Sequence, residues 1–375
     1  MRIYLDNNAT TAIHPDVLRV LEVSLRELFG NASSIHKEGQ AARRAIEDAR
    51  ESVARLIGAT PREIVFTSGG TESNNAAIFG ATREAGRCHI VTSSIEHPSV
   101  AEAVRELERR GCEVTMISPS RSGEVSAKSV VDAIRSDTRL VTVMLVNNET
   151  GVVQPVDAIG RACRERGVHF HVDAVQAAGK IDVNVEAMQC DTLALSAHKM
   201  HASKGVGALY VRRGVAMASH VVGGAQERRR RAGTENVPLA AAFGAAAGLA
   251  TDLVARRRMA DLRDRLEAGV RASLDVTING ADVRRVPNTS NITFHGGDGE
   301  GIVIALDLSG VAVSTGSACS SGRVEPSPVL VAMGLTPEAA RATVRFSLSR
   351  FTTAEEIDRV VELLRELVPR CTPVT

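Results

Sequence analysis

The stretch VHFHVDAVQAAGKIDVNVEAMQCDTLALSAHK, residues 168–199, decides the fold that we expect for the whole chain. It contains two short apolar runs, residues 168–172 and 192–195, which are typical of buried parallel strands. Polar residues follow each run, with Asp173 after the first and Lys199 after the second. Because ligands of open α/β sheets bind at the carboxyl ends of the strands, we expect this carboxylate and this amine to share one crevice.

A carboxylate and an amine in one crevice suit the cofactor pyridoxal 5'-phosphate (PLP). A lysine amine forms a Schiff base with the aldehyde of PLP, and a carboxylate keeps the pyridinium nitrogen protonated so that the ring accepts electrons. A salt bridge at the end of a strand would use the same two residue types. The rest of the chain must therefore decide between a cofactor site and a structural ion pair.

The composition is that of an ordinary globular protein with a large core. The chain has 375 residues, of which 44% are hydrophobic, and this is enough for two domains. With 45 basic and 44 acidic residues the formal charge is +1, so no overall field favours nucleic acid or an anionic membrane. The N-terminus lacks the apolar core of a signal peptide, and no apolar run approaches the ~20 residues of a membrane span. We expect neither a nucleic-acid nor a membrane partner.

The cysteines indicate thiols rather than a metal or disulfide framework. None stands in a CxxC pair or at the His/Cys spacing of a zinc site. We expect no metal site, no structural disulfide and a reducing cytoplasm, with all thiols except Cys319 in the core or incidental. The six cysteines are Cys88, Cys112, Cys163, Cys190, Cys319 and Cys371.

Strand-like and helix-like segments alternate from residue 63 to residue 211. Such alternation, with strands rich in Val, Ile and Leu, predicts an α/β fold whose mainly parallel sheet carries helices on both faces. The Ala- and Gly-rich run 239–249 suits a helix packed closely against another backbone or subunit. The expected strands span residues 63–67, 89–93, 113–117, 140–146, 168–172, 192–195 and 207–211.

From about residue 255 the pattern becomes that of a smaller α+β domain. A charged amphipathic helix leads to short strands, and a final helix begins with a capping box formed by Thr353 and Glu356. We predict a large domain of residues 16–255 and a small domain of residues 1–15 and 256–375.

A glycine-rich turn follows the first strand of the alternating region, in EIVFTSGGTESNN at residues 63–75. Gly69 and Gly70 let backbone amides approach a ligand closely, and Thr71 with the start of the next helix adds donors, which together favour a phosphate group. The spacing fits neither a Walker A motif nor GxGxxG, so a nucleotide is disfavoured.

Three further polar residues stand near strand ends. His97 could stack on a ring and exchange protons, although a lone histidine often has a structural role. Asn148 and Gln176 could hydrogen-bond the phenolic oxygen of PLP, although Asn148 also suits a turn. The convergence favours the cofactor, because five strand ends each present a group suited to one part of PLP. These groups are Thr71, His97, Asn148, Asp173 and Lys199.

Taken together, these motifs resemble those of cysteine desulfurases of the NifS and IscS type, in the class V aminotransferase-like branch of fold type I PLP enzymes. The resemblance covers essentially the whole chain, and it implies a large domain with a seven-stranded sheet. Its motifs are YLDNNATT at 4–11, SGGTES at 68–73, EH at 96–97, NNETG at 147–151, HVDAVQ at 171–176, SAHK at 196–199, RAGTEN at 231–236, GSAC at 316–319 and RFSLSRFT at 345–352.

The resemblance implies a role for each matching residue. Lys199 would form the Schiff base, Asp173 would hold the pyridinium nitrogen, and His97 would stack on the ring and transfer protons. Gly70, Thr71, Ser196 and His198 would hold the phosphate, Asn148 and Gln176 would lie near the phenolic oxygen, and Asn8 and Asn31 would line the substrate site.

Other implied roles concern the substrate and a second subunit. Arg345 would clamp the substrate carboxylate, for which a planar guanidinium is a natural partner. Thr234 would reach the phosphate of the neighbouring subunit's cofactor, which implies a homodimer.

Cys319 would be the nucleophile that collects sulfur. It lies in STGSACSSG, residues 314–322, a run of small residues that makes a poor core element and a good mobile loop. A buried small thiol is the alternative. An ordinary thiol has a pKa of about 8.5, so the reaction needs a proton acceptor, and the resemblance suggests His97.

The expected activity is the conversion of L-cysteine to L-alanine with transfer of sulfur to Cys319 as a persulfide, which would pass to an iron–sulfur scaffold or another acceptor thiol. One alternative is a selenocysteine lyase or another PLP-dependent cysteine lyase. The other is a non-catalytic sulfur-relay or assembly subunit, which the presence of Lys199, Asp173, Arg345 and Cys319 disfavours.

The chain departs from the family pattern in two places. His201, Ala202 and Ser203 stand where an aromatic residue, Gly and Pro are common. The glycine-rich run before the arginine cluster reads Gly223-Gly224-Ala225, and Arg229 replaces a frequent glycine. Neither departure removes a group with an implied catalytic role.

Overall fold

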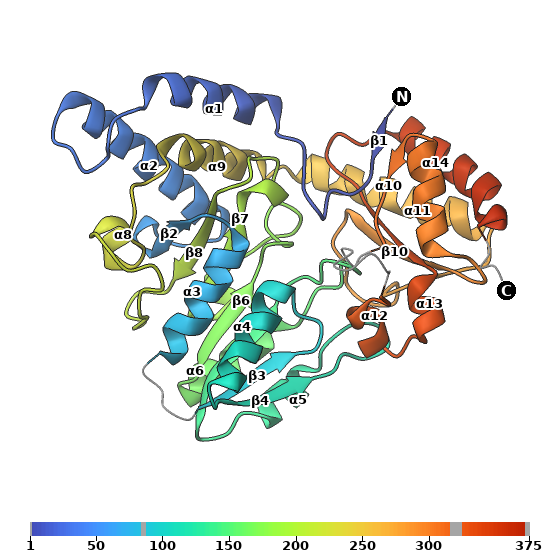
Figure 1. Ribbon diagram of the computed structural model, residues 1–375, viewed down its shortest axis with the longest axis horizontal. Coiled ribbons are helices and arrows are strands. Elements are labelled where there is room, and N and C mark those ends of the chain that lie inside the picture. The colour runs from blue at the N-terminus through green and yellow to red at the C-terminus, as the bar shows by residue number, and fades with distance from the viewer. Residues whose placement is uncertain (1, 84–87, 316–324, 372–375) are drawn as a thin grey trace.

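A seven-stranded sheet forms the centre of the computed structural model, which describes residues 2–83, 88–315 and 325–371 (Figure 1). The strand order is β2-β8-β7-β6-β5-β3-β4. The strands from β7 to β4 are parallel, whereas β8 is antiparallel to both β2 and β7. Because two antiparallel steps restore the direction, β2 ends at the same edge as the parallel strands. The strands are β2 (Ile64–Thr67), β3 (His89–Ser93), β4 (Glu113–Ile117), β5 (Thr138–Met144), β6 (His169–Asp173), β7 (Thr192–Ser196) and β8 (Gly207–Val211).

Helices cover both faces of this sheet, as the alternation predicted (Figure 1). Successive residues of β2 show the two faces: Val65 packs with α3, and its neighbours Ile64 and Phe66 belong to the main core that contains α2, α6 and α9. The helices of this region are α1 (Pro15–Glu27), α2 (Lys37–Leu56), α3 (Gly70–Thr82), α4 (Pro98–Arg109), α5 (Ala127–Asp132), α6 (Val156–Arg166), α7 (Val185–Met188), α8 (Gln226–Arg229) and α9 (Val237–Leu249).

The Ala- and Gly-rich helix α9 packs closely on α2, which confirms the prediction for this run. A Cβ atom at Gly244 would lie 2.6 Å from the Cα of Ala49 in α2. Only glycine lets the two backbones approach so closely.

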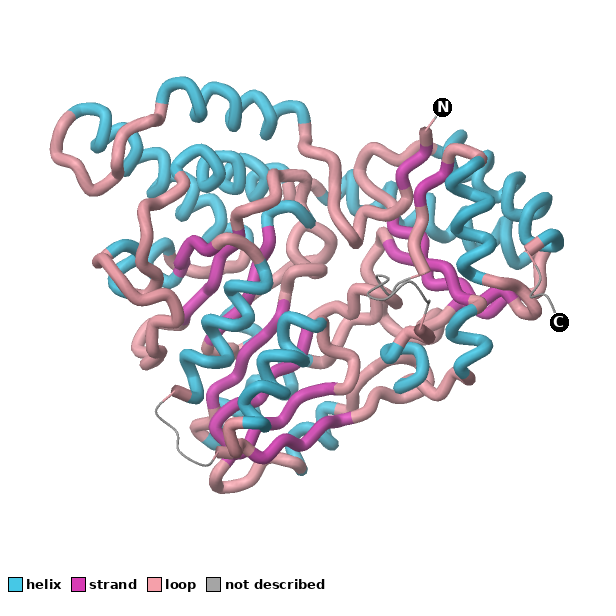
Figure 2. The backbone as a smooth tube through the Cα atoms, viewed as in Figure 1, coloured by secondary structure: helices cyan, strands magenta, loops and turns pink. Residues whose placement is uncertain are grey.

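A second hydrophobic cluster joins the N-terminal strand to the C-terminal third of the chain. Figure 2 shows the strands of this region to one side of the seven-stranded sheet. The division at residues 15/16 and 255/256 stays a prediction. The elements are the parallel pair β1 (Ile3–Tyr4) and β11 (Val311–Ala312), the antiparallel strands β9 (Val276–Ile278), β10 (Thr289–Phe294) and β12 (Thr343–Ser347), and the helices α10 (Leu253–Arg271), α11 (Gly299–Leu308), α12 (Pro328–Ala332), α13 (Pro337–Arg341) and α14 (Ala354–Leu367).

The prediction that no disulfide forms was wrong, because the structure joins Cys88 to Cys112. These residues directly precede β3 and β4, whose parallel register pairs His89 with Glu113 and so brings the two Cα atoms to 4.7 Å. Sequence spacing does not reveal this proximity. Cys163 and Cys190 are free and buried, as expected for core thiols.

Among the described residues, no single helix is both long and apolar enough to cross a membrane. Within this part of the chain, α9 and α10 taken together reach that length and composition, and the chain bends by 73° between them.

Candidate active site

The sheet brings Asp173 and Lys199 to one cavity. Asp173 is the last residue of β6, and Lys199 ends the short 3-10 turn η2 (Ala197–Lys199) that follows β7. The two strands are parallel neighbours, so both side chains leave the sheet at its carboxyl edge. Both line a cavity of about 200 Å³. The acid and the amine therefore share the crevice that the strand pattern predicted.

The Lys199 amine is held by the N-terminal segment of the chain. Its Nζ donates to the carbonyl oxygens of Asn8 at 2.5 Å and Ala9 at 2.7 Å. Burial lowers the pKa of the Lys199 amine to about 8, and the Arg345 guanidinium acts in the same direction against the opposing effect of Asp173. A lysine with this pKa is uncharged often enough to attack an aldehyde near neutral pH.

The glycine-rich turn places the N-terminus of α3 beside this amine. α3 begins at Gly70, where a Cβ atom would lie 2.7 Å from Val175 Cγ2 and 3.5 Å from Ser196 Cβ, so any side chain would fill this part of the cavity. Thr71 and Ser196 line the same space. The first-turn N–H groups of α3 and these hydroxyls make a donor set that suits a phosphate.

His198 adds a neutral imidazole to this side of the cavity. Burial lowers its pKa to about 4, and the Lys199 and Lys204 ammonium groups act in the same direction. Its Nδ1 pairs with the Thr10 hydroxyl at 3.1 Å. The ring is therefore uncharged at neutral pH and available for hydrogen bonding.

His97 lies after β3 and caps helix α4. Its Nδ1 accepts the backbone N–H of Ser99 at 3.1 Å, which explains why a histidine directly precedes Pro98 at the start of the helix. The ring lines the cavity together with Ser99.

Asn148 and Gln176 complete the predicted set. The Asn148 carbonyl accepts from Asn8 Nδ2 at 3.1 Å, and Gln176 Nε2 donates to the Asn8 carbonyl at 2.9 Å. The Lys180 amine donates to the Gln176 carboxamide oxygen and to Asn8 Oδ1. Burial lowers the pKa of the Lys180 amine well below its ordinary value, and the neighbouring Lys199 and Arg345 cations act in the same direction.

Nearly all predicted cofactor residues thus line one cavity. Only Thr234 of the predicted set is absent from its walls. Those that line it are Gly70, Thr71, His97, Asn148, Asp173, Gln176, Ser196, His198 and Lys199.

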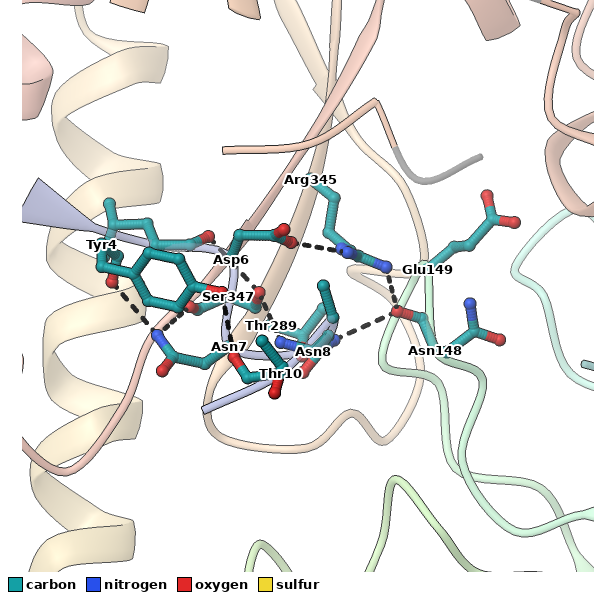
Figure 3. A network of polar contacts seen from close by, with 12 residues as sticks. Tyr4, Asp6, Asn7, Asn8, Thr10, Asn148, Glu149, Thr289, Arg345 and Ser347 are labelled. Carbon is teal, nitrogen blue, oxygen red and sulfur yellow. Dashed lines mark hydrogen bonds and ion pairs between the residues drawn. The ribbon is translucent and has the colours of Figure 1, made fainter. Parts of the chain in front are cut away.

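The predicted substrate residues Arg345 and Asn8 do not line this cavity, but both contact Asn148, which does (Figure 3). Arg345 Nη1 donates to the Asn148 carbonyl at 3.0 Å, and Nη2 pairs with Asp6 at 2.7 Å. The Asn8 amide donates to Thr289 Oγ1 at 2.9 Å. The N-terminal segment therefore lies between the two parts of the chain and contributes to the site directly.

Three predicted residues do not join this cluster. Asn31 is exposed between α1 and α2, where its side chain accepts the backbone N–H of Ser33. Thr234 is exposed after α8. Cys319 lies outside the described residues, so its predicted role stays a prediction.

Sequence reasoning missed several polar residues of the site. Asn74 and Ser99 line the cavity, and Asn74 Nδ2 donates to Asp173 Oδ2 at 2.9 Å. Asn74 follows Gly70 by four residues, so helical spacing would have placed it on the same face as the turn. Glu96 is buried beside His97, and burial raises the pKa of its carboxyl to about 8. The motif EH at 96–97 includes Glu96, but the resemblance assigned a role only to His97.

Each of the two departures from the family pattern includes a non-glycine residue with a positive φ angle. His201 has φ of +63°, and its Nδ1 pairs with the Ala12 carbonyl at 2.9 Å. Arg229 has φ of +64°, a conformation that glycine adopts more easily. The second departure therefore has a conformational cost.

The residues present fit PLP. The cavity is lined by an amine of lowered pKa, by a carboxylate and by a small-residue turn at a helix N-terminus. The buried Nε of Arg345 has no hydrogen-bond partner among the described residues. This free donor at the rim suits a carboxylate ligand, as an amino-acid substrate would supply.

The fold and the cavity define an α/β enzyme of the PLP-dependent fold type I class, and comparisons with known proteins specify the family. The Aminotransferase class-V family model matches residues 3–360. The chain belongs to the class V aminotransferase family, whose enzymes use PLP.

Relatives within this family carry more specific names. A "Cysteine desulfurase" from Nostoc sp. is 47% identical over 372 residues, which cover 98% of this chain and 93% of the relative. "Cysteine desulfurase IscS" from Serratia proteamaculans is 45% identical over 98% of this chain and 93% of its own length.

Solved structures agree with these relatives. A "NIFS-LIKE PROTEIN" superposes with a TM-score of 0.92 at 35% identity, and the match covers 99% of this chain and all of that one. "SspA in complex with cysteine" superposes with a TM-score of 0.85 at 36% identity over 94% of this chain and 100% of that one.

Proposed function

We propose that this protein is a PLP-dependent cysteine desulfurase, which converts L-cysteine to L-alanine and passes the sulfur to Cys319 as a persulfide. The proposal depends above all on the cavity that Lys199 and Asp173 share, with Arg345 at its rim. The names of the relatives, and the neighbour solved with cysteine, support cysteine as the substrate.

PLP would supply an electron sink next to the substrate amine. Each cavity residue would bind a particular part of PLP. Lys199 would bind the aldehyde carbon and Asp173 the pyridinium nitrogen. Gly70, Thr71, Ser196 and His198 would bind the phosphate, His97 would contact the ring, and Asn148 and Gln176 would lie near the phenolic oxygen.

Arg345 would bind the substrate carboxylate. The guanidinium is already oriented by Asp6 and by the Asn148 carbonyl, and its free Nε is buried. Asn8 would lie next to the substrate, because its backbone carbonyl already contacts Lys199. The proposed contribution of Asn31 requires a neighbouring subunit or a movement of its loop, because Asn31 is exposed in the single chain.

Cys319 would take the sulfur. The Cys319 thiolate would attack the substrate sulfur and the carbon–sulfur bond would break. The electron pair of that bond would stay with the carbon, which would take up a proton to become the methyl group of alanine. The product pair is L-alanine and an enzyme persulfide, so no external oxidant or reductant is needed. An iron–sulfur scaffold or another thiol would then accept the persulfide sulfur.

A second copy of this chain would complete the assembly. Helix α1 leaves Leu18, Val23 and Leu25 exposed, and Phe29 after it is 77% exposed. Such an apolar face is typical of a subunit interface. A recess of about 1360 Å³ next to Thr234, lined by arginines and glutamates, would lie at the same interface, so that Thr234 could reach the partner's cofactor. Light scattering should give twice the monomer mass, and a strictly monomeric active enzyme would disprove the homodimer.

The central test is Lys199→Ala in the purified protein. Wild-type protein should be yellow from bound PLP, and the variant should lose the absorbance of the lysine-bound cofactor together with alanine formation. Lys128→Ala, at an exposed ion pair with Asp132, is the matched control and should retain both. An unchanged spectrum in Lys199→Ala would remove the central assignment.

A second test separates the desulfurase from the alternatives. After incubation with L-cysteine, peptide mass spectrometry should find one added sulfur on Cys319, and Cys319→Ser should stop persulfide formation. Cys371→Ser, at a half-buried thiol, serves as control. Free sulfide and alanine at the wild-type rate in Cys319→Ser would identify a cysteine lyase, and a strong preference for selenocysteine would identify a selenocysteine lyase. A protein without bound cofactor would be a sulfur-relay subunit.

A further inference from the structure

A line of hydrogen bonds joins Asp173 to His97 through two residues to which the sequence assigned no role. Asn74 Nδ2 donates to Asp173 Oδ2 at 2.9 Å and to Ser99 Oγ at 2.8 Å. Ser99 Oγ in turn lies 2.8 Å from His97 Nδ1. Asn74 and Ser99 are both buried, so water does not replace these partners.

Asp173 fixes which way the Asn74 amide points. An ionised carboxylate only accepts hydrogen bonds, and Asp173 Oδ1 already accepts the backbone N–H of Val175 at 2.9 Å. The group of Asn74 that faces Asp173 Oδ2 is therefore its NH₂ group. Its Oδ1 then faces His171 Nε2 at 3.0 Å, so that nitrogen must carry a proton. His171 Nδ1 remains an acceptor for the Thr192 hydroxyl at 2.9 Å.

The same orientation sets the Ser99 hydroxyl. One N–H of Asn74 is directed at Asp173, and the other is directed at Ser99 Oγ. Because Ser99 Oγ accepts from Asn74, its own proton is free to point toward His97 Nδ1. His97 Nδ1 is then an acceptor.

The helix cap leads independently to the same conclusion. The backbone N–H of Ser99, which can only donate, points at His97 Nδ1 at 3.1 Å because His97 caps α4. Two donors therefore face one ring nitrogen. A proton on Nδ1 would lose the bond from the backbone N–H and would reverse the bond to Ser99, so that the hydroxyl proton would have to turn away from the ring.

We propose that Asn74 and Ser99 are positioning residues that hold the neutral His97 ring as the tautomer with its proton on Nε2, which it presents to the cavity as a donor. The functional part of this inference rests on the cavity roles proposed for His97 and Asp173. Losing the cap would cost enough to give an excess of this tautomer of roughly fivefold.

This tautomer limits which proton transfers His97 can make in the reaction. The neutral ring donates a hydrogen bond from Nε2, and it accepts a proton only on Nδ1, at the expense of the α4 cap. The charged groups that face the ring are Asp173 from β6 and Lys199 from η2. Desolvation is the largest influence and lowers the pKa of the ring, so the neutral form is the relevant one near neutral pH. The proton of the substrate thiol therefore has to leave through another group or through a change of tautomer.

Nitrogen-15 NMR of the sedimented holoenzyme, labelled at histidine, tests the tautomer directly. The signals of His97 among the 10 histidines are those absent from His97→Gln. The expected result is Nδ1 in the range of an unprotonated ring nitrogen and Nε2 in the N–H range. A protonated Nδ1, or shifts averaged between the two forms, would overturn the proposal.

Variants of Ser99 test the positioning role. Ser99→Ala retains the backbone N–H but removes the hydroxyl, so the excess of the Nε2–H form should shrink severalfold, and Ser99→Thr should restore it. Ser126→Ala, which removes a capping hydroxyl from the remote helix α5, should leave the His97 shifts unchanged. If Ser99→Ala lowers thermal stability without moving these shifts, Ser99 has only a structural role. The shifts are measured whether or not the protein desulfurates cysteine, so failure of the proposed function and failure of this inference are distinguishable.

Discussion

Arg345 Nη2 pairs with Asp6 Oδ1 at 2.7 Å and thereby joins β12 to the N-terminal segment at the rim of the cavity (Figure 3). Both residues also contact parts of the chain that are distant in sequence, since Arg345 Nη1 reaches the Asn148 carbonyl and the register places Asp6 next to Ser347. The guanidinium is therefore oriented before any substrate binds. An arginine that is already oriented loses less side-chain entropy when it captures a carboxylate.

Replacing Arg345 by lysine should weaken substrate binding selectively. Lysine keeps the charge but not the planar pair of donors, and a hydrogen bond to a charged group contributes about 1.5–3 kcal/mol, so KM for L-cysteine should rise about tenfold or more. Steady-state kinetics measure this, and the cofactor absorbance should be unchanged. Arg285→Lys, at a buried pair with Glu267 away from the cavity, is the matched control and should leave KM unaltered. An unchanged KM in Arg345→Lys would exclude this residue as the carboxylate clamp.

The pKa of Lys199 predicts how the apoenzyme takes up PLP. Only the uncharged amine attacks the aldehyde, and burial together with Arg345 lowers the pKa of this amine to about 8. The rate of uptake should therefore rise with pH from 6.5 and level off above 8, as followed by absorbance after mixing. In Arg345→Ala a cation that lowers the pKa is lost, so the midpoint should move to higher pH. A midpoint above 10 in the wild type would contradict the lowered pKa.

The positions of the site residues along the strands were predictable, because parallel strands deliver their ends to one edge of the sheet. Asp173 and Lys199 illustrate this, since each follows an apolar run and the two runs pair directly. Gly70 and His97 were predictable for the same reason, because each lies at the start of a helix, α3 or α4, that follows a strand of the sheet.

Contacts between distant side chains were not predictable in this way. Asn74 reaches Asp173 across a sequence separation of 99 residues, and the Asn8 carbonyl reaches Lys199 across 191. Periodicity describes which face of an element is buried, but it carries no information on which polar partners meet there. The Cys88–Cys112 bond escaped prediction for the same reason, since it depends on the register of two strands.

Glu96 should make stability fall as pH rises. Burial raises the pKa of its carboxyl from 4.5 to about 8, so the folded protein holds a proton that the unfolded chain releases. This contribution is fully present below about pH 4.5 and is lost as pH rises toward 8, at up to about 1.4 kcal/mol per pH unit. Glu96→Gln cannot ionise. Urea unfolding at several pH values measures the free energy of unfolding of both proteins. Between pH 5 and 8 this free energy should rise in the variant relative to the wild type. A constant difference would show that Glu96 does not titrate in this range.

Arg229→Gly should stabilise the protein. Arg229 is exposed and has φ of +64°, where a residue with a Cβ atom is strained by about 1–2 kcal/mol. Glycine relieves this strain but loses more entropy on folding, so the net gain should be about 1 kcal/mol. Arg228→Gly is the matched comparison: Arg228 has φ of +58°, but its guanidinium donates to the Arg62 carbonyl at 3.2 Å, so relief of strain is offset by a lost contact. Thermal unfolding measures both variants. An equal rise in melting temperature in the two would contradict the expected difference between Arg229 and Arg228.

Removing the Glu227 carboxylate should lower stability strongly. Its buried carboxylate accepts two hydrogen bonds from Arg50, at 2.7 and 2.8 Å, and the backbone N–H of Phe66 at 3.0 Å. Glu227→Ala would leave the buried Arg50 guanidinium with only the exposed Glu47 carboxylate, 3.2 Å from its Nε, as an ion partner, which costs up to about 3–5 kcal/mol. Asp358→Ala, at an exposed pair with Arg265, should cost less than about 1 kcal/mol.

The double variant Arg50→Met, Glu227→Ala should recover much of that loss, because it removes both charges instead of leaving one without its partner. Urea unfolding of the two single variants and the double variant measures the coupling between Arg50 and Glu227. A loss in Glu227→Ala no greater than in Asp358→Ala would mean that water reaches Arg50 and that the pair does not hold α2 against the segment containing α8. A double variant as unstable as Glu227→Ala would instead attribute the loss to the hydrogen bond from the Phe66 N–H to Glu227, which both variants lack.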